Sequence, residues 1–153
     1  MRIHIVAIGR ARTGPEGVLF KHYSDRVNRW PISLVELDLR KPTAPNKTTE
    51  AEAALLQQAV PEGAYVVALD EHGKQHSSRE FARFIAGQQD DGCRDLVFLI
   101  GGADGLAPPV REGADRMLSL GRATWPHLLV RGLLAEQIYR AQQIIAGHPY
   151  HRD

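Results

Sequence analysis

Short apolar stretches alternate along this chain with longer stretches in which apolar and polar residues are mixed. Residues 2–9, 64–70 and 95–100 are short and apolar, and the first of them is also rich in β-branched side chains. They predict buried strands, because the inner strands of a parallel sheet carry apolar side chains on both faces. Residues 33–39 alternate apolar and polar side chains and predict a half-exposed strand, whereas residues 117–120 predict a short one.

The segments between the predicted strands carry apolar residues three or four positions apart. Such spacing predicts amphipathic helices that pack one face on the sheet. The predicted helices cover residues 15–30, 49–60, 78–89, 108–115 and 126–146. The last would be about 30 Å long at roughly 1.5 Å per residue.

Two threonines are placed to begin helices. Thr49 precedes an apolar run and has Glu52 three residues later, which is a pattern that caps a helix N-terminus. Thr124 stands just before the last predicted helix and is a second candidate cap. Residues 40–49 hold two prolines and three basic residues, so we expect a loop there.

The alternation of strands and helices indicates one α/β domain over residues 1–153 with a mainly parallel sheet. A length of 153 residues, with 43% hydrophobic and 24% charged side chains, suits a single soluble globular domain and excludes disordered classes. No apolar run approaches the roughly 20 residues that cross a bilayer, so we expect no membrane partner. The single cysteine, Cys93, excludes an internal disulfide and fits the reducing cytoplasm.

The formal net charge of +1 hides regions of opposite sign. Residues 1–49 carry nine basic and four acidic side chains, residues 50–115 five and twelve, and residues 116–153 five and two. Both ends are therefore basic around an acidic middle. This distribution is compatible with a phosphate-binding face and also with an ordinary solvated surface.

Three of the predicted strand ends have an unusual composition. Residues 69–73, 101–105 and 120–126 stand at or just after strand ends, and the second segment holds three glycines that let a ligand approach the backbone closely. Ligands of parallel sheets bind beyond the carboxyl ends of the strands. These segments therefore predict a ligand pocket at one edge of the sheet.

The residues that several common kinds of site require are absent or wrongly spaced in this chain. The chain contains neither a G-x-x-x-x-G-K-[ST] phosphate loop nor a G-x-G-x-x-G dinucleotide loop. His72 and His76 flank a predicted turn, and His148 and His151 surround a proline, so we expect no metal site. Cys93 lies in a polar loop, and no serine has an evident histidine and acid partner.

The C-terminal residues 147–153 gather tyrosine, histidine and arginine after the last predicted helix. One interpretation is a solvated tail, because chain ends usually carry little structure. The other is a segment that folds over a site and supplies hydrogen bonds and positive charge. Both interpretations stay open on the residues alone.

Several groups of residues match a known family. They are Val6-Ala7-Ile8-Gly9, Leu69-Asp70 with Gly73-Lys74, and Leu99-Ile100-Gly101-Gly102 with Gly105-Leu106. The most specific group begins at Leu118 and includes Pro126-His127, Arg131, Glu136-Gln137, Tyr139-Arg140-Ala141 and His148-Pro149-Tyr150-His151. On these residues the whole chain resembles the ribosomal RNA large subunit methyltransferase H family, part of the SPOUT superfamily.

The resemblance implies a fold and a reaction that the residue pattern alone does not show. Members of this family have an α/β fold with a C-terminal trefoil knot that forms the cofactor pocket, and they are homodimers with each site completed near the partner chain. They use S-adenosyl-L-methionine to methylate N3 of a pseudouridine in a loop of 23S rRNA on the assembled ribosome. We therefore expect this cofactor, with 23S rRNA within the ribosome and a second copy of the chain as partners, and no metal, membrane or DNA.

Carried over position by position, the resemblance implies a set of cofactor-binding residues at the strand ends: Leu69, Gly101, Leu120, Gly121, Arg122, Ala123, Thr124 and Trp125. Backbone groups would bond the adenine edge and the methionine part, while Leu69, Leu120 and Trp125 would give apolar walls. Gly121-Arg122 and Ala103-Asp104 depart from the family pattern, which has a serine with a small or basic residue and a proline-acid pair. We expect cofactor binding to survive, because the pocket relies largely on backbone.

The resemblance also implies three catalytic candidates, Tyr150, Arg152 and His127. Arg152 would stabilise the anionic uracil ring, and Tyr150 would stack on the base or hydrogen-bond it. His127 would either accept the N3 proton or only cap the helix, and both roles stay open. We expect the other charged residues of the last helix to form structural pairs across the dimer: Arg131, Glu136 and Arg140.

Two other functions stay open beside this expectation. One is a ribosome-associated binding module that keeps the pocket without catalysis, against which the intact tail argues. The other is a SPOUT methyltransferase for another RNA such as tRNA, against which the lack of an added RNA-binding domain argues. The net charge of +1 favours a preassembled particle over naked RNA, because a free-RNA binder needs a strong basic field.

Overall fold

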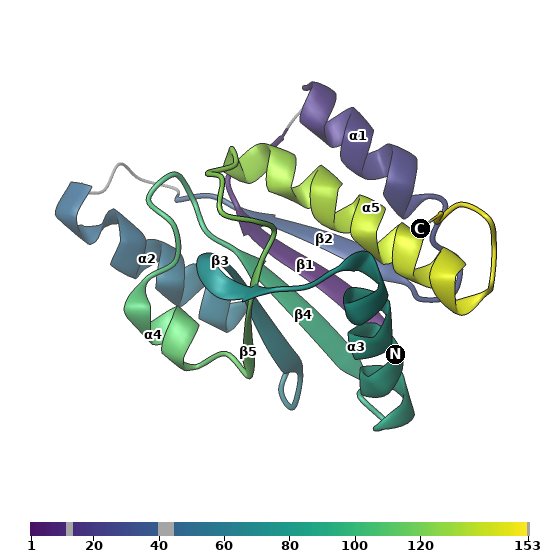
Figure 1. The fold of residues 1–153 in the computed structure, drawn as a ribbon. Coiled ribbons are helices and arrows are strands. Elements are labelled where there is room, and N and C mark those ends of the chain that lie inside the picture. The colour runs from purple at the N-terminus through teal and green to yellow at the C-terminus, as the bar shows by residue number, and fades with distance from the viewer. Residues whose placement is uncertain (12–13, 40–44, 153) are drawn as a thin grey trace.

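The sheet at the centre of the molecule is parallel throughout. The computed structural model describes residues 1–11, 14–39 and 45–152, and its strands stand in the order β2-β1-β4-β3-β5 (Figure 1). The strands are β1 Arg2–Ile8, β2 Ile32–Leu37, β3 Tyr65–Gln75, β4 Asp95–Ile100 and β5 Arg116–Ser119. Every neighbouring pair of these strands is parallel, which confirms the predicted sheet type and supplies the strand order that spacing could not give.

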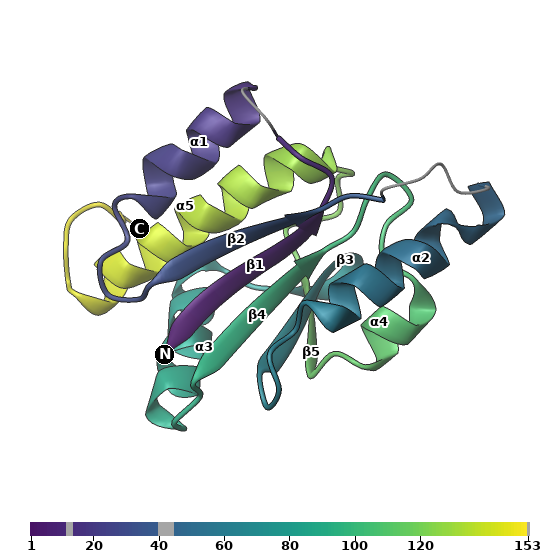
Figure 2. The ribbon, with the colours of Figure 1, turned by 180° about the vertical axis from the view of Figure 1, so that it is seen from behind.

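Helices cover both faces of the sheet, and the two layers are visible from opposite sides (Figures 1 and 2). The helices are α1 Pro15–Ser24, α2 Pro45–Gln58, α3 Ser78–Asp90, α4 Pro108–Glu112 and α5 His127–Ile145. One core cluster joins Ile5 and Phe98 of the sheet to side chains of α3 and α5. The other joins Val97 and Leu99 to α2 and α4. Successive residues of β4 thus point to opposite faces, and all six are buried.

The first helix is shorter than its apolar spacing predicts. α1 ends at Ser24, and Trp30, expected in the same helix, lies in the following loop with 1% of its surface exposed. The backbone N–H groups of Asn28 and Arg29 both donate to the Gln142 side chain of α5 instead of to a helical carbonyl. The residue after Trp30 is a proline, which also disfavours helix at that point. The prediction that residues 15–30 form one helix is therefore wrong beyond Ser24.

The second helix begins earlier than predicted. α2 starts at Pro45, where a proline suits the first helical position, so Thr49 lies inside the helix and does not cap it. The predicted loop is wrong over residues 45–49, and residues 40–44 lie outside the described part of the chain. α3 begins with a capping box that the predicted caps did not include: the Ser77 side chain accepts from the Glu80 N–H, and the Glu80 carboxylate accepts from the Ser77 N–H.

The third strand continues past its predicted end at Asp70. β3 runs to Gln75, and its pairing with β5 shifts between Leu69 and Lys74, so that both residues pair with Leu118. A Cβ on Gly73 would lie 2.6 Å from backbone atoms of Leu118. Only glycine permits this close return of the chain. The residues of β3 after Asp70 are mostly exposed, which is why the apolar pattern stops before the strand does.

The last helix starts at His127, close to its predicted start, but without the predicted cap. Pro126 precedes the helix and makes no side-chain capping bond, and Thr124 faces a cavity instead. Within the described residues no helix combines the length and apolar character needed to cross a membrane.

Candidate functional site

A cavity of about 430 Å³ lies where the carboxyl ends of β3, β4 and β5 meet the start of α5. We call it the first cavity. Its walls come mainly from residues 69–72, 100–106 and 118–125, which are the three strand ends that the sequence singled out. The prediction of a pocket at this edge of the sheet is confirmed. The position follows from the parallel sheet, which brings these ends to one side.

Backbone forms much of the first cavity because a glycine stands at a crowded point. A Cβ on Gly101 would lie 2.4 Å from the carbonyl oxygen of Gly105, closer than any side chain allows. The chain therefore folds back on itself directly after β4 and leaves its peptide groups at the cavity wall. Peptide N–H and C=O groups can hydrogen-bond a ligand without needing particular side chains.

Most of the residues expected to bind the cofactor line the first cavity. They are Leu69, Gly101, Leu120, Gly121, Ala123, Thr124 and Trp125. Arg122 is exposed and is not part of the wall, so the structure does not place it with the others. Trp125 is 43% exposed, which leaves its ring free to cover a ligand at the mouth. Asp70, His72 and Asp104 also line the cavity; they belong to the strand ends that predicted it but not to the expected cofactor set, and Arg111 belongs to neither.

Two aspartates, Asp70 and Asp104, line the first cavity, together with Arg111. Asp70 accepts hydrogen bonds from the His72 backbone N–H and ring, each at 2.9 Å, and lies 3.7 Å from Arg111. Burial of Asp70 opposes ionisation, but these hydrogen bonds and the charge of Arg111 outweigh it and hold its pKa below the usual value. Asp104 lines the same cavity. Its charge, after burial, raises the pKa of Glu52 on α2.

His127 lines the first cavity from the first turn of α5. Burial, and then the charge of Arg131 one turn further along the helix, lower the pKa of His127 below 6.5. The imidazole is therefore neutral at pH 7 and able to accept a proton.

Arg131 ties the start of α5 to the ends of β1 and β2. Its side chain is 1% exposed, pairs with Glu36 of β2, and donates to the carbonyl oxygens of Ile8 and Gly9 at 2.6 and 2.9 Å. Glu36 also accepts from the Ala11 N–H at 2.8 Å. Arg131 was expected in a pair across the dimer, but it makes these contacts within one chain. It positions the helix that holds His127.

A second cavity of about 400 Å³ adjoins the first. The two share the end of β5 and the loop after it, so this segment separates them. The other wall of the second cavity comes from residues 75–78, between the end of β3 and the start of α3, and from Phe81, Leu133, Glu136 and Gln137. Amide, hydroxyl and imidazole groups lie there beside apolar side chains.

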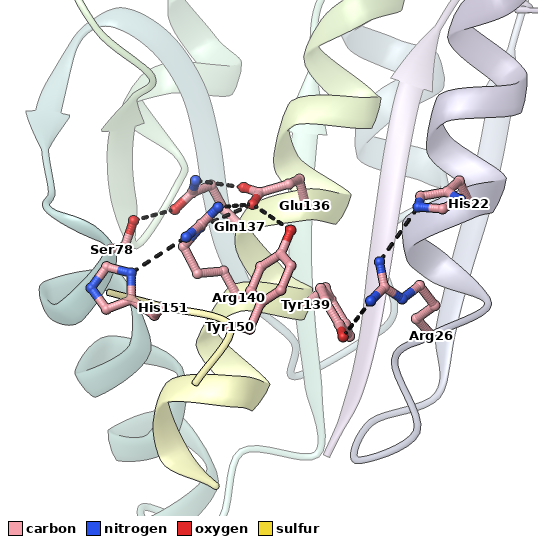
Figure 3. Close-up of polar contacts among 9 residues, drawn as sticks. All are labelled: His22, Arg26, Ser78, Glu136, Gln137, Tyr139, Arg140, Tyr150 and His151. Carbon is pink, nitrogen blue, oxygen red and sulfur yellow. Dashed lines mark hydrogen bonds and ion pairs between the residues drawn. The ribbon is translucent and has the colours of Figure 1, made fainter. Parts of the chain in front are cut away.

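A polar network connects the second cavity to the C-terminal tail (Figure 3). Ser78 donates to Gln137 at 2.9 Å, and Gln137 donates to Glu136 at 2.7 Å. Arg140 also donates to Glu136, as does the hydroxyl of Tyr150 at 3.2 Å. Glu136 is thus the centre of the network, and it pairs with Arg140 of its own helix rather than across a dimer.

The tail lies against the second half of α5 and not at the first cavity. The Tyr150 ring meets Tyr139 edge-on at 4.8 Å and the Arg140 guanidinium at 4.8 Å, while Arg152 is exposed. Burial, with the neighbouring Tyr23 hydroxyl and Glu136 carboxylate, raises the pKa of Tyr150 to about 12. Its hydroxyl therefore stays protonated and acts as a donor.

The structure therefore separates the three catalytic candidates within one chain. His127 stands at the first cavity, whereas Tyr150 contacts Glu136, nine residues along α5 or roughly 13 Å at about 1.5 Å per residue. Across residues 1–11, 14–39 and 45–152, no three or more histidine, cysteine or acidic side chains are grouped so as to hold a metal ion.

Comparison with known proteins identifies the chain. The family model described as "Predicted SPOUT methyltransferase" matches residues 1–151. A ribosomal RNA large subunit methyltransferase H from Rhodospirillum centenum is 54% identical over 152 residues, covering 99% of each chain. The protein of the same name from Paramagnetospirillum magneticum is 51% identical with the same coverage. The chain belongs to the ribosomal RNA large subunit methyltransferase H family of SPOUT methyltransferases.

Solved structures share the fold of this SPOUT methyltransferase at low sequence identity. A probable methylase family protein from Haemophilus influenzae aligns with a TM-score of 0.60 and 12% identity, covering 99% of this chain and 70% of that one. A probable methyltransferase from Bordetella pertussis aligns with a TM-score of 0.57 and 17% identity, covering 92% and 95%. The α/β architecture expected from the residue pattern is thus one that these two proteins share.

The second cavity was not predicted from the sequence. Its polar wall includes Ser77 and Ser78, which the sequence shows only as the start of a helix, and Gln137, which it shows only as part of a motif. The extension of β3 brings these groups beside α5. The part of β3 beyond its bulge is mostly exposed and carries no apolar pattern, so nothing in the pattern pointed to this wall.

Proposed function

We propose that this chain transfers a methyl group from S-adenosylmethionine to N3 of a pseudouridine in a loop of 23S rRNA, on the assembled ribosome. The observation that carries the proposal is the first cavity, whose wall contains nearly all of the residues that the resemblance assigns to cofactor binding. Its relatives are named for action on ribosomal RNA. An enzyme of ribosomes works in the cytoplasm, where we expect this chain.

The first cavity fits S-adenosylmethionine in size and in chemistry. About 430 Å³ lies within the range of small-molecule pockets. The peptide groups packed around Gly101 suit the adenine edge, and Leu69, Leu120 and Trp125 suit the faces of the adenosine. The carboxylates of Asp70 and Asp104 suit a ligand that bears ammonium and sulfonium charges.

Bound S-adenosylmethionine supplies a methyl group already activated by its sulfonium, so no metal is required. The protein has to align the acceptor nitrogen and help remove its proton. His127 accepts the proton of the acceptor nitrogen, at Nε2 or Nδ1, because this neutral imidazole lines the first cavity. Tyr150 donates a hydrogen bond, and Arg152 stabilises the anionic ring. The second cavity receives the base, since it opens beside the first and offers amide and hydroxyl partners.

The separation of His127 from the tail supports a homodimer. Within one chain Tyr150 contacts the middle of α5, whereas His127 lies at its start. We propose that the tail of each chain completes the site of its partner, and that the strand ends around the first cavity belong to a trefoil knot. Analytical ultracentrifugation should show a dimer, and a monomer that is fully active would contradict this arrangement.

Cofactor binding is tested by titration calorimetry. S-adenosylmethionine should bind the purified chain, and Gly101→Ala should weaken binding at least tenfold, because its Cβ would displace the backbone at Gly105. Gly87→Ala on α3 is the matched control, since a Cβ there meets nothing within 4 Å. Absence of heat with the wild-type chain would contradict the methyltransferase proposal.

The role of the tail is tested by Arg152→Ala. Turnover should be lost while S-adenosylmethionine affinity stays within about twofold, because Arg152 is exposed and lies outside the first cavity. Calorimetry and methyl transfer to purified ribosomes measure the two quantities. Equal loss of both would mean that the tail supports the fold.

The substrate is tested by mass spectrometry of rRNA from a strain that lacks the gene. The pseudouridine in the 23S loop should lose its N3 methyl group and regain it on complementation. A methyl group that persists would exclude this substrate. Complementation with Arg152→Ala distinguishes an enzyme from a binding module, since only an enzyme fails to restore the methyl group.

A further inference from the structure

A third cavity, of about 280 Å³, lies beside the second one and is lined by basic side chains. Its wall consists of Lys74, His76, Glu80, Arg83, Phe84 and Arg116. His76 also lines the second cavity, so the first, second and third cavities follow one another across the molecule. The motifs that relate the chain to its family do not assign a binding site to the residues of the third cavity.

The three cations come from different elements that the fold brings together. Lys74 follows the bulge of β3, Arg83 lies on α3, and Arg116 begins β5. The Arg116 guanidinium stands over the Phe84 ring, with its carbon 4.5 Å from the centroid, which fixes its direction. Lys74 and Arg83 are exposed, so their charged ends can reach a ligand.

The single acid in the third cavity is already engaged. Glu80 accepts from the Ser77 N–H at 2.7 Å in the cap of α3. Three cations against one carboxylate leave a net positive charge in a region of the sequence where acidic side chains outnumber basic ones. A concave surface with this surplus of charge attracts an anion.

His76 adds a second sign of a missing partner. Its Nδ1 atom is buried and has no hydrogen-bond partner among the described residues. The ring stands edge-on to Phe84 at 6.2 Å, between the second and third cavities. A buried polar atom without a partner is costly, so its position on the path between two cavities points to a ligand that supplies one.

We propose that the third cavity binds a backbone phosphate of the RNA strand whose target base enters the second cavity. This inference rests on the proposed function. A strand that places a base beside Ser78 and Gln137 carries phosphates on either side of that base, and the third cavity adjoins this position. Lys74, Arg83 and Arg116 then neutralise the phosphate, and the contact positions the strand without reading its sequence.

The test is the double variant Lys74→Gln with Arg83→Gln, assayed on purified ribosomal substrate at several salt concentrations. KM should rise about tenfold and kcat should stay within twofold. The slope of log kcat/KM against log salt should become shallower by about 0.7, as expected for one lost phosphate on a single strand. Lys74→Arg with Arg83→Lys, which keeps both charges, should restore the wild-type values.

Arg94→Gln is the matched control, because Arg94 is exposed just before β4, outside all three cavities. It should leave KM and the salt slope unchanged. An unchanged KM in the double variant would overturn the inference, and so would a raised KM with the wild-type salt slope, which would indicate a protein carboxylate as the partner. If only the phosphate inference is wrong, the wild-type protein still binds S-adenosylmethionine and turns over. If the proposed function is wrong, the wild-type protein does neither.

Discussion

Arg131 and Arg140 lie on the same helix and each pairs with a glutamate, but the two pairs have very different surroundings. The Arg131 side chain is 1% exposed and contacts Glu36 together with two carbonyl oxygens at the end of β1. The Arg140 side chain is 25% exposed and contacts Glu136 on its own helix, next to the Tyr150 ring. The first pair joins α5 to the sheet, whereas the second joins it to the tail.

The difference indicates how the two halves of α5 contribute to the site. A buried charge that loses its partner is strongly destabilising, so the Arg131 end is held in one position, together with His127 and the first cavity. The Glu136–Arg140 pair is more exposed than Arg131, at 16% and 25%, and joins residues of a single helix, so we expect it to contribute less. The Arg131 end thus holds one wall of the first cavity in place, and the Glu136 end contacts the tail.

The largest effect is expected when the buried pair is broken. Arg131→Met should lower the free energy of unfolding by about 3–5 kcal/mol, because Glu36 and the carbonyls of Ile8 and Gly9 lose their donor. Arg140→Met should cost about 1 kcal/mol or less. Urea unfolding of both variants measures the difference, and equal losses would remove the contrast between the two ends.

A smaller effect is expected at the tail. Tyr150→Phe removes the 3.2 Å hydrogen bond to Glu136 but keeps the ring contact with Tyr139, so stability should fall by about 0.5–1.5 kcal/mol. The measurement is the urea midpoint, with Tyr65→Phe as control because its ring packs on Phe84. A loss above 3 kcal/mol would mean that the tail is as firmly anchored as Arg131.

The smallest effect is a difference in pH dependence. His127 has a pKa below 6.5 and must be neutral to accept a proton, so kcat should fall as the pH drops through that pKa. Tyr150, with a pKa of about 12, stays protonated across the same range and should add no such limb. The kcat–pH profile of wild type and Tyr150→Phe should therefore share this acidic limb.

His127→Asn completes this test, since asparagine does not titrate. The residual activity should lose its dependence on pH below 6.5. An acidic limb that persists would mean that another group accepts the N3 proton. Turnover on purified ribosomes at constant ionic strength is the measurement, because binding of RNA itself depends on salt.

Prediction from the sequence succeeded where local pattern and burial agree. β4 has the predicted bounds, 95–100, because a run buried on both faces leaves no other interpretation. The predicted caps Thr49 and Thr124 were wrong, because a proline precedes or begins each of those helices. The end of α1 was predicted wrongly because a side chain from α5, Gln142, captures the backbone of Asn28 and Arg29. No window of neighbouring residues contains that contact.

The residues of the candidate site also fall into those that local sequence predicted and those that only the fold brings together. Gly101 and the loop from Leu120 to Trp125 were predicted because strand ends and a family motif mark them. Arg111, His76 and the polar wall of the second cavity were not, because their role depends on which elements adjoin. Arg122 stands in the motif but outside the cavity wall, since neighbours in a loop can face opposite ways.

The sequence by itself determined the alternation of strands and helices, the glycines that allow close turns, and the family to which the chain belongs. These follow from short-range sterics, from periodic burial and from motif identity, all of which are written along the chain. The tertiary structure decided the strand order, the partners of Arg131 and the place of the tail. Those depend on contacts between residues far apart in sequence, such as the pairing of Glu36 with Arg131, which no local pattern encodes.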